Sequence, residues 1–193
     1  MHAEEAKDHI DEVREHRGTK YIALLIAILA ALLAVVEMTS DNARVDALKS
    51  NTDAANLWSF YQAKTLRQTT LRTEAERLEL DLIGMPPAQA EAAQKRLQAW
   101  RATIDRYESE PSTNEGRKEL SARAQAAEAA RDHALAANDR LDLSTASLQI
   151  AIVLASASVV LGIAWLAWVG GGLGLIGLVF ALLGWFLTAL PHL

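Results

Sequence analysis

The stretch YIALLIAILAALLAVV, residues 21–36, is apolar throughout apart from one tyrosine hydroxyl. A helix that crosses a bilayer needs about 20 apolar residues, so this run is slightly short. Lys20 and Glu37 flank it and can extend their charged ends into the two interfaces. The run leaves no polar face for a soluble core helix, and no small-residue cleavage pattern marks a signal peptide. We therefore predict a membrane span over residues 19–38.

The C-terminal part of the chain lacks every charged residue. No Asp, Glu, Lys or Arg occurs from Leu143 to Leu193, whereas a soluble domain spreads its charge over the whole surface. We predict spans over residues 146–169 and 173–190, with the glycines at 170–172 forming a tight turn between them. Tryptophans near the predicted ends suit interfacial anchors: Trp165, Trp168 and Trp185.

Small residues recur at four-residue intervals in all three segments. Such stripes let helix backbones approach closely in lipid, although Ala and Gly are also common in spans for other reasons. We expect helix–helix contacts, within one chain or between chains, along three stripes: Ala23, Ala27 and Ala31; Ser147, Ala151 and Ala155; Gly177 and Ala181.

Basic residues before the first segment indicate its orientation. Lys7, Arg14, Arg17 and Lys20 precede it, while Arg44 and Lys49 follow it among acidic residues. The positive-inside rule then places the N-terminus in the cytoplasm. We expect a multi-pass protein of a bacterial inner membrane, with the central region on the periplasmic side.

The N-terminal tail, residues 1–20, has the pattern of an amphipathic helix. Its histidines share one face at heptad spacing, and a glutamate precedes two of them by one helical turn: His2, His9 and His16, with Glu5 and Glu12. Such a ladder can bind a divalent metal where several tails meet. One turn supplies only two ligands, so we expect a solvated helix face instead.

The central region, residues 39–145, is rich in strong helix formers. We predict one long helix over residues 41–83 that can continue from the first span, and Gly84, Pro86 and Pro87 end it. A second helix ends at Glu110 and Pro111. A third begins at a capping box over residues 112–115 and continues into the second span. The seam of the first helix comprises Leu57, Tyr61, Leu71, Ala75, Leu78 and Leu82, with Lys64 and Gln68 filling two positions.

These elements predict an all-α integral membrane protein. It has three transmembrane helices and a long extramembrane helical hairpin or coiled-coil bundle. The seams are narrow and rich in alanine, so a single copy buries little apolar area. We therefore expect a homo-oligomer or a place in a larger membrane protein complex, with the lipid bilayer as the other partner.

The sequence lacks the motifs of the common chemistries. It has no cysteine, Walker loop, dinucleotide fingerprint or HExxH motif, and no ionisable residue lies in the middle of a predicted span. The net charge is −5 without a basic tract, which argues against nucleic-acid binding. We expect no catalytic residues, no cofactor and no metal site.

The segment LWSFYQAK, residues 57–64, follows the first predicted span. With the layout of one span and then two, it resembles an uncharacterised bacterial membrane family, domain of unknown function 4337. That family shows a similar WxxYQAK stretch, a tail rich in His and Glu, and a C-terminal hairpin whose turn often carries Arg or Lys. The glycines at 170–172 depart from that turn. The resemblance implies no activity.

Four residues of this segment are candidates for a helix or subunit contact: Trp58, Tyr61, Gln62 and Lys64. Three-residue spacing lets Trp58, Tyr61 and Lys64 face one partner, with Lys64 over an aromatic ring. Packing within a single bundle is the alternative.

We expect a non-enzymatic membrane scaffold or accessory subunit that self-associates or stabilises a larger complex. The alternatives are an oligomeric channel or transporter component and a membrane sensor that acts through a partner.

Overall fold

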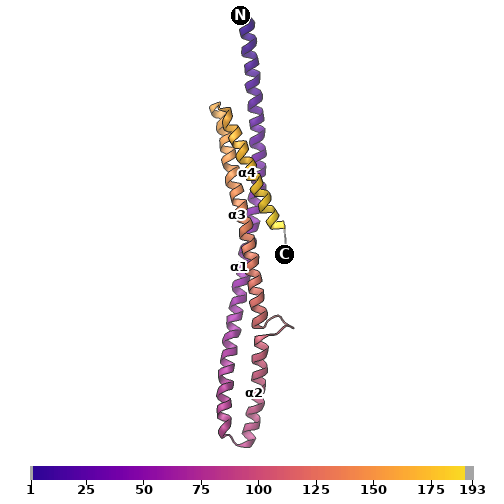
Figure 1. The fold of residues 1–193 in the computed structure, drawn as a ribbon, viewed down its shortest axis with the longest axis vertical. Coiled ribbons are helices and arrows are strands. Elements are labelled where there is room, and N and C mark those ends of the chain that lie inside the picture. The colour runs from indigo at the N-terminus through magenta and orange to yellow at the C-terminus, as the bar shows by residue number, and fades with distance from the viewer. Residues whose placement is uncertain (1, 190–193) are drawn as a thin grey trace. The chain divides into compact units, whose positions relative to one another are not determined.

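The computed structural model describes the backbone of residues 2–189 and the side chains of residues 18–188. This part of the chain is helical, without a strand, as predicted. The helices in Figure 1 are α1 (His2–Asp81), α2 (Pro87–Glu108), α3 (Arg117–Leu161) and α4 (Ala164–Ala189), with a 3-10 turn, η1, at Leu82–Gly84. Three helices are long and apolar enough to cross a membrane. The side chains of the predicted His2, His9 and His16 ladder lie outside the described residues.

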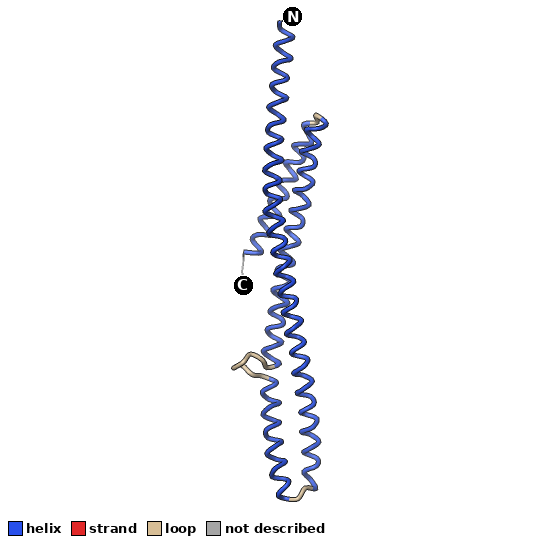
Figure 2. Tube along the Cα trace, turned by 180° about the vertical axis from the view of Figure 1, so that it is seen from behind, coloured by secondary structure: helices blue, strands red, loops and turns tan. Residues whose placement is uncertain are grey.

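Helix α1 runs without a break from His2 through the apolar segment to Asp81, so the helix predicted over residues 41–83 is continuous with that segment. It contains no proline, and Gly18 is its only glycine, so nothing local ends it before Asp81. Pro86 is extended and Pro87 is the first residue of α2. Proline fits this position because the first N–H of a helix has no partner within the helix. Figure 2 shows this loop, and the loop between α2 and α3, in tan.

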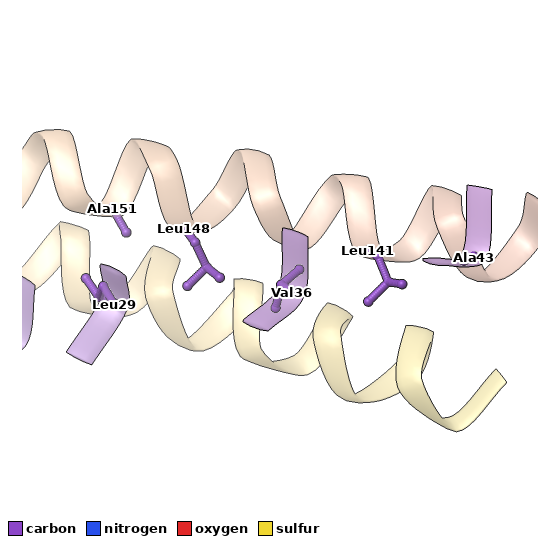
Figure 3. Packing of buried hydrophobic residues seen from close by; sticks show 6 residues of the cluster. All are labelled: Leu29, Val36, Ala43, Leu141, Leu148 and Ala151. Carbon is purple, nitrogen blue, oxygen red and sulfur yellow. The ribbon is translucent and has the colours of Figure 1, made fainter. Parts of the chain in front are cut away.

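The chain divides into two units, Met1–Ala47 with Asp132–Leu193, and Leu48–Arg131. We call them the apolar unit and the hairpin unit. The core of the apolar unit lies between α1 and α3 (Figure 3). It consists of Leu29, Val36, Ala43, Leu141, Leu148 and Ala151.

Glycines let α4 pack closely against α3 in the apolar unit. Gly170, Gly177 and Gly184 lie one heptad apart and are buried. A Cβ at Gly170 would lie 2.8 Å from the Ala151 carbonyl oxygen, and one at Gly184 would lie 2.7 Å from Leu141 Cγ. The Ser144 hydroxyl donates a 2.7 Å hydrogen bond to the Gly177 carbonyl, so a polar group is satisfied inside this interface.

The predicted position of the turn between the last two segments is wrong. The glycines at 170–172 lie inside α4, and the turn is at Gly162, which has a φ of 68°. Glycine adopts that left-handed conformation without steric cost. The Ser158 hydroxyl donates to the Ile163 carbonyl at 3.0 Å and closes the turn. The predicted bounds 146–169 and 173–190 are therefore replaced by the end of α3 at Leu161 and the start of α4 at Ala164.

The hairpin unit pairs the second half of α1 with α2 and the start of α3. Its buried cluster consists of Ala75, Leu97 and Ile104, with Leu71, Leu78 and Trp100 packed against it. The predicted capping box over residues 112–115 is wrong, because α3 begins at Arg117 and residues 111–114 form a turn.

Candidate functional site

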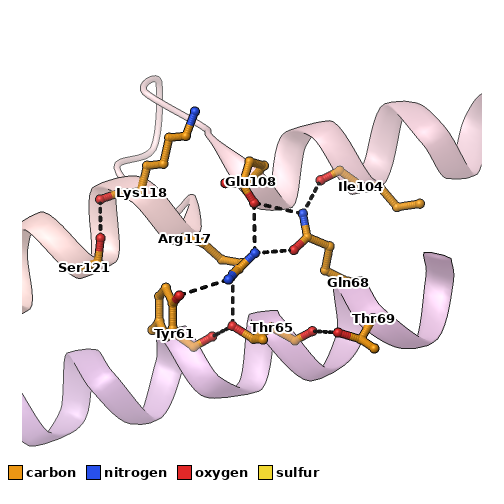
Figure 4. Close-up of polar contacts among 9 residues, drawn as sticks. All are labelled: Tyr61, Thr65, Gln68, Thr69, Ile104, Glu108, Arg117, Lys118 and Ser121. Atoms are coloured by element: carbon orange, nitrogen blue, oxygen red, sulfur yellow. Dashed lines mark hydrogen bonds and ion pairs between the residues drawn. The ribbon is translucent and has the colours of Figure 1, made fainter. Parts of the chain in front are cut away.

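Arg117 is the centre of a polar cluster in the hairpin unit (Figure 4). Its Nε donates to Thr65 Oγ1 at 2.9 Å, and its Nη2 donates to the Tyr61 hydroxyl at 2.9 Å. Its Nη1 donates to Gln68 Oε1 at 2.6 Å and to Glu108 Oε2 at 2.9 Å. The first residue of α3 is thereby bonded to α1 and to the end of α2.

Gln68 completes this cluster from the buried seam of α1, where only 3% of it is exposed. Its Nε2 donates to the Ile104 carbonyl and to Glu108 Oε2, each at 3.1 Å. Its Oε1 accepts from Arg117, so both ends of the amide are used. Because an amide with both ends bonded fits only one position, the cluster fixes the register of α1 against α2 and α3.

Lys64 lies beside the cluster, and only 6% of its side chain is exposed. Its Nζ is 3.8 Å from Glu110 Oε2 and 3.8 Å from Glu115 Oε2, both in the loop between α2 and α3. It also lies 5.2 Å from the centre of the Phe60 ring and 5.8 Å from that of Tyr107. Two carboxylates and two ring faces thus surround one ammonium group.

Glu119 braces the same loop from the first turn of α3. Its carboxylate accepts from the Ser109 hydroxyl at 2.6 Å and from the Glu110 backbone N–H at 3.1 Å. The bond from Ser109 is the main cause that lowers the pKa of Glu119 below its ordinary value. Gly116 is buried against this bond, and a Cβ there would meet Glu119 and the Glu110 backbone.

The structure places the four predicted contact residues in two different environments. Trp58 and Tyr61 meet edge to face at 5.5 Å, and Trp58 Nε1 donates to Glu128 Oε1 of α3 at 2.8 Å. Tyr61 and Lys64 contact the groups described above, so these three residues lie in the seam of the hairpin unit. Gln62 is exposed and belongs to a different face of α1.

The sequence prediction missed Arg117, Glu108 and Glu119. A signal for Arg117 was present, because it lies three residues before Leu120, and Leu120 and Ala124 are both buried on the same side of α3. The predicted capping box placed the start of α3 too early, so Arg117 was not recognised as the first residue of the helix. Nothing in the local sequence indicates that Glu108 bonds Gln68 and Arg117 or that Glu119 bonds Ser109 and Glu110.

A second polar cluster lies between α1 and α3 of the apolar unit. The Ser40 hydroxyl lies 3.0 Å from Asn138 Oδ1 and 2.8 Å from Asp142 Oδ1, and Asn138 Nδ2 donates to Asp142 Oδ2 at 3.0 Å. Arg44 pairs with Asp142 at 3.3 Å. Ser40 and Asn138 are buried, so this cluster specifies how the two helices face each other.

The predicted small-residue stripes differ in what they contact. Ala151 and Ala155 of α3 are fully buried, and Ser147 is half-buried. On α4, Gly177 is buried and Ala181 packs against the core. Ala23, Ala27 and Ala31 are exposed on α1, on the side opposite the buried Leu29 and Val36.

The Arg117 cluster joins three helices through hydrogen bonds and an ion pair. Its donors and acceptors are bonded to one another rather than directed into an open cavity. Among the described residues, no three His, Cys, Asp or Glu side chains gather in a group that could hold a metal ion.

Comparison with known proteins gives one match. The family model described as "Domain of unknown function (DUF4337)" matches residues 18–187, which is nearly the whole chain and agrees with the predicted resemblance. No curated protein and no solved structure matches the chain.

Proposed function

This chain belongs to the DUF4337 family, whose description states no activity, and from its geometry we propose a non-enzymatic membrane scaffold or accessory subunit. In this proposal the apolar unit lies in the bilayer and associates with other spans. The helices of the hairpin unit provide a fixed surface for a second copy or for a larger complex.

Membrane insertion is supported by three long apolar helices and by the side chains they expose. Leu24, Val153 and Trp185 are 58%, 65% and 64% exposed, which water would disfavour and lipid would solvate. The basic residues before the first span favour a cytoplasmic N-terminus, and a periplasmic hairpin unit in a bacterial inner membrane.

The observation that carries the proposal is the exposed alanine face of α1. Close packing of α4 on α3 already uses the glycines at 170, 177 and 184, whereas Ala23, Ala27 and Ala31 are exposed. In lipid the hydrophobic effect does not drive helices together, so close backbone approach is the main available attraction. This face therefore suits a span of a second copy.

The hairpin unit supports the same role. Its helices leave large apolar side chains in water, with Leu66 70%, Leu80 70% and Ile83 87% exposed. Burying these side chains against a partner is favourable by roughly 1.5–3 kcal/mol for each that is fully covered.

The test measures the mass of the full-length protein in mild detergent by mass photometry. We expect an oligomer for the wild type and a smaller species for Ala27→Leu, because the added side chain separates the helices. Val179→Leu, which adds bulk at an exposed position of α4, is the matched control and should leave the mass unchanged. A monomeric wild type that also captures no partner from native membranes would refute the proposal.

A further inference from the structure

An apolar groove of about 810 Å³ runs between α1 and α4 within the apolar unit. This volume falls within the range of about 300–1,000 Å³ that is typical of ligand sites. One wall is formed by Tyr21, Leu25 and Ile28 of α1, and the other by Ala167, Gly171 and Leu175 of α4. The space exists because α4 places the small residues Ala167 and Gly171 opposite the large side chains of α1.

Gly171 lines the groove at a position where a side chain could be added without a clash. A Cβ at this position would find its nearest neighbour, Leu25 Cδ2, at 4.0 Å, which is ordinary van der Waals contact. At Gly174, one turn further along α4, a Cβ would meet Leu29 Cδ2 at 2.6 Å, so there the helices are closed. The two helices thus touch at Gly174 and Leu29, while the groove leaves room at Gly171.

The other end of the groove has the composition of a membrane interface. Tyr21 and Trp168 line it and are 72% and 83% exposed. Tyrosine and tryptophan favour the level of the lipid headgroups. Lys20 is exposed beside Tyr21, and its long side chain can carry a positive charge to that level.

We propose that this groove binds one acyl chain of a bilayer phospholipid, whose phosphate lies within reach of Lys20. The proposal rests on the membrane insertion proposed above. The groove belongs to two helices that are apolar enough to cross a membrane, and its lining offers hydrocarbon rather than hydrogen bonds. The lysine supplies charge complementarity to an anionic headgroup at the aromatic end.

The test is native mass spectrometry of the full-length protein purified from membranes in mild detergent. We expect the wild type to retain a phospholipid and Gly171→Leu to lose it, because the new side chain fills the groove without a backbone clash. Val153→Leu, on an exposed face of α3 away from the groove, is the matched control and should retain the lipid.

A second variant tests the headgroup. We expect Lys20→Ala to keep binding but to lower the preference for phosphatidylglycerol over phosphatidylcholine by about fivefold, the effect of one lysine near an anionic surface. A wild type without bound lipid, or Gly171→Leu with unchanged lipid, would overturn the proposal. So would a lipid-free wild-type dimer that Gly171→Leu converts to monomer, since a second copy would then fill the groove.

Carbonate extraction of membranes distinguishes a failure of the proposed membrane insertion from a failure of the proposed lipid site. If the chain is extracted, membrane insertion fails and the lipid site fails with it. If it stays in the membrane but retains no lipid, only the lipid site is refuted.

Discussion

Arg117 connects α3 to α1 and to the end of α2 in the hairpin unit. It donates to four side chains, one of them the carboxylate of Glu108, and hydrogen bonds to charged groups are worth about 1.5–3 kcal/mol. We expect Arg117→Ala to lower the free energy of unfolding by about 2–3 kcal/mol, measured by urea denaturation of the full chain in detergent.

Two further variants make this prediction specific. Lysine lacks the planar fork that bonds several partners at once, so Arg117→Lys should behave more like alanine than like the wild type. Arg67→Ala, at an exposed position of α1, should change stability by no more than about 0.5 kcal/mol. Equal losses at both arginines would contradict the role of the cluster.

Lys64 is buried but poorly paired, which leads to the opposite expectation. Its carboxylate partners are both 3.8 Å away, while desolvation of the ammonium is costly. We expect Lys64→Met to change the free energy of unfolding by less than about 1 kcal/mol, in either direction, because an apolar side chain also suits the two aromatic rings. A large loss in the same urea assay would show that the long ion pairs are stronger than their geometry indicates.

The loop between α2 and α3 should be sensitive to acid through Glu119. Its folded pKa is lowered, so its contribution to stability is complete above the ordinary glutamate pKa and is lost as the pH falls through the folded value. Glu119→Gln cannot accept both bonds, because its NH₂ group would face a donor. We expect the difference in the free energy of unfolding between wild type and Glu119→Gln to be constant near neutral pH and to disappear in acid. A difference that persists at low pH would contradict this assignment.

The packing of α4 on α3 makes two glycines respond differently to the same change. A Cβ at Gly170 would lie 2.8 Å from a backbone oxygen, whereas one at Gly172 would meet nothing within 4 Å. We expect Gly170→Ala to destabilise the protein by about 1–3 kcal/mol through overpacking. Gly172→Ala should be neutral or stabilising by up to about 1 kcal/mol, because alanine favours a helix. Thermal unfolding in detergent compares the two, and equal shifts would refute the close contact.

The sequence predicted the helices better than their ends. The apolar runs, the heptad seams and the break at Gly84 and Pro86 are local patterns, and each indicated the observed helix. The position of the last turn was not accessible in this way. A glycine at a turn, such as Gly162, cannot be distinguished in the sequence from glycines that admit a neighbouring helix, such as Gly170 and Gly177. Only the packing partner distinguishes them.

The candidate site was only partly predictable for a related reason. Trp58, Tyr61 and Lys64 share one side of α1, and their spacing indicated a common contact. Their partners Glu128, Arg117 and Glu110 come from other helices and from a loop. Which residues meet there depends on where the loop ends and α3 starts, and this is a long-range property.

The orientation of the whole chain can be tested because the protein contains no cysteine. We expect Thr113→Cys, in the loop of the hairpin unit, to react with a membrane-impermeant maleimide in intact spheroplasts. Leu161→Cys, beside the turn at Gly162, should react only after lysis. The reverse pattern would place the N-terminus outside and would contradict the assignment based on basic residues.

The turn between α3 and α4 also bears on how the chain is made. Only Gly162 and Ile163 separate the two helices, so the folded hairpin has almost no connecting loop. If both helices are spans, they enter the bilayer together as one hairpin, and the Ser144 hydroxyl meets the Gly177 carbonyl as that pair leaves the insertion machinery. A nascent chain halted before Gly177 would expose this hydroxyl to hydrocarbon. If both helices are spans, completion of α4 is therefore the step that gives the Ser144 hydroxyl its partner on α4.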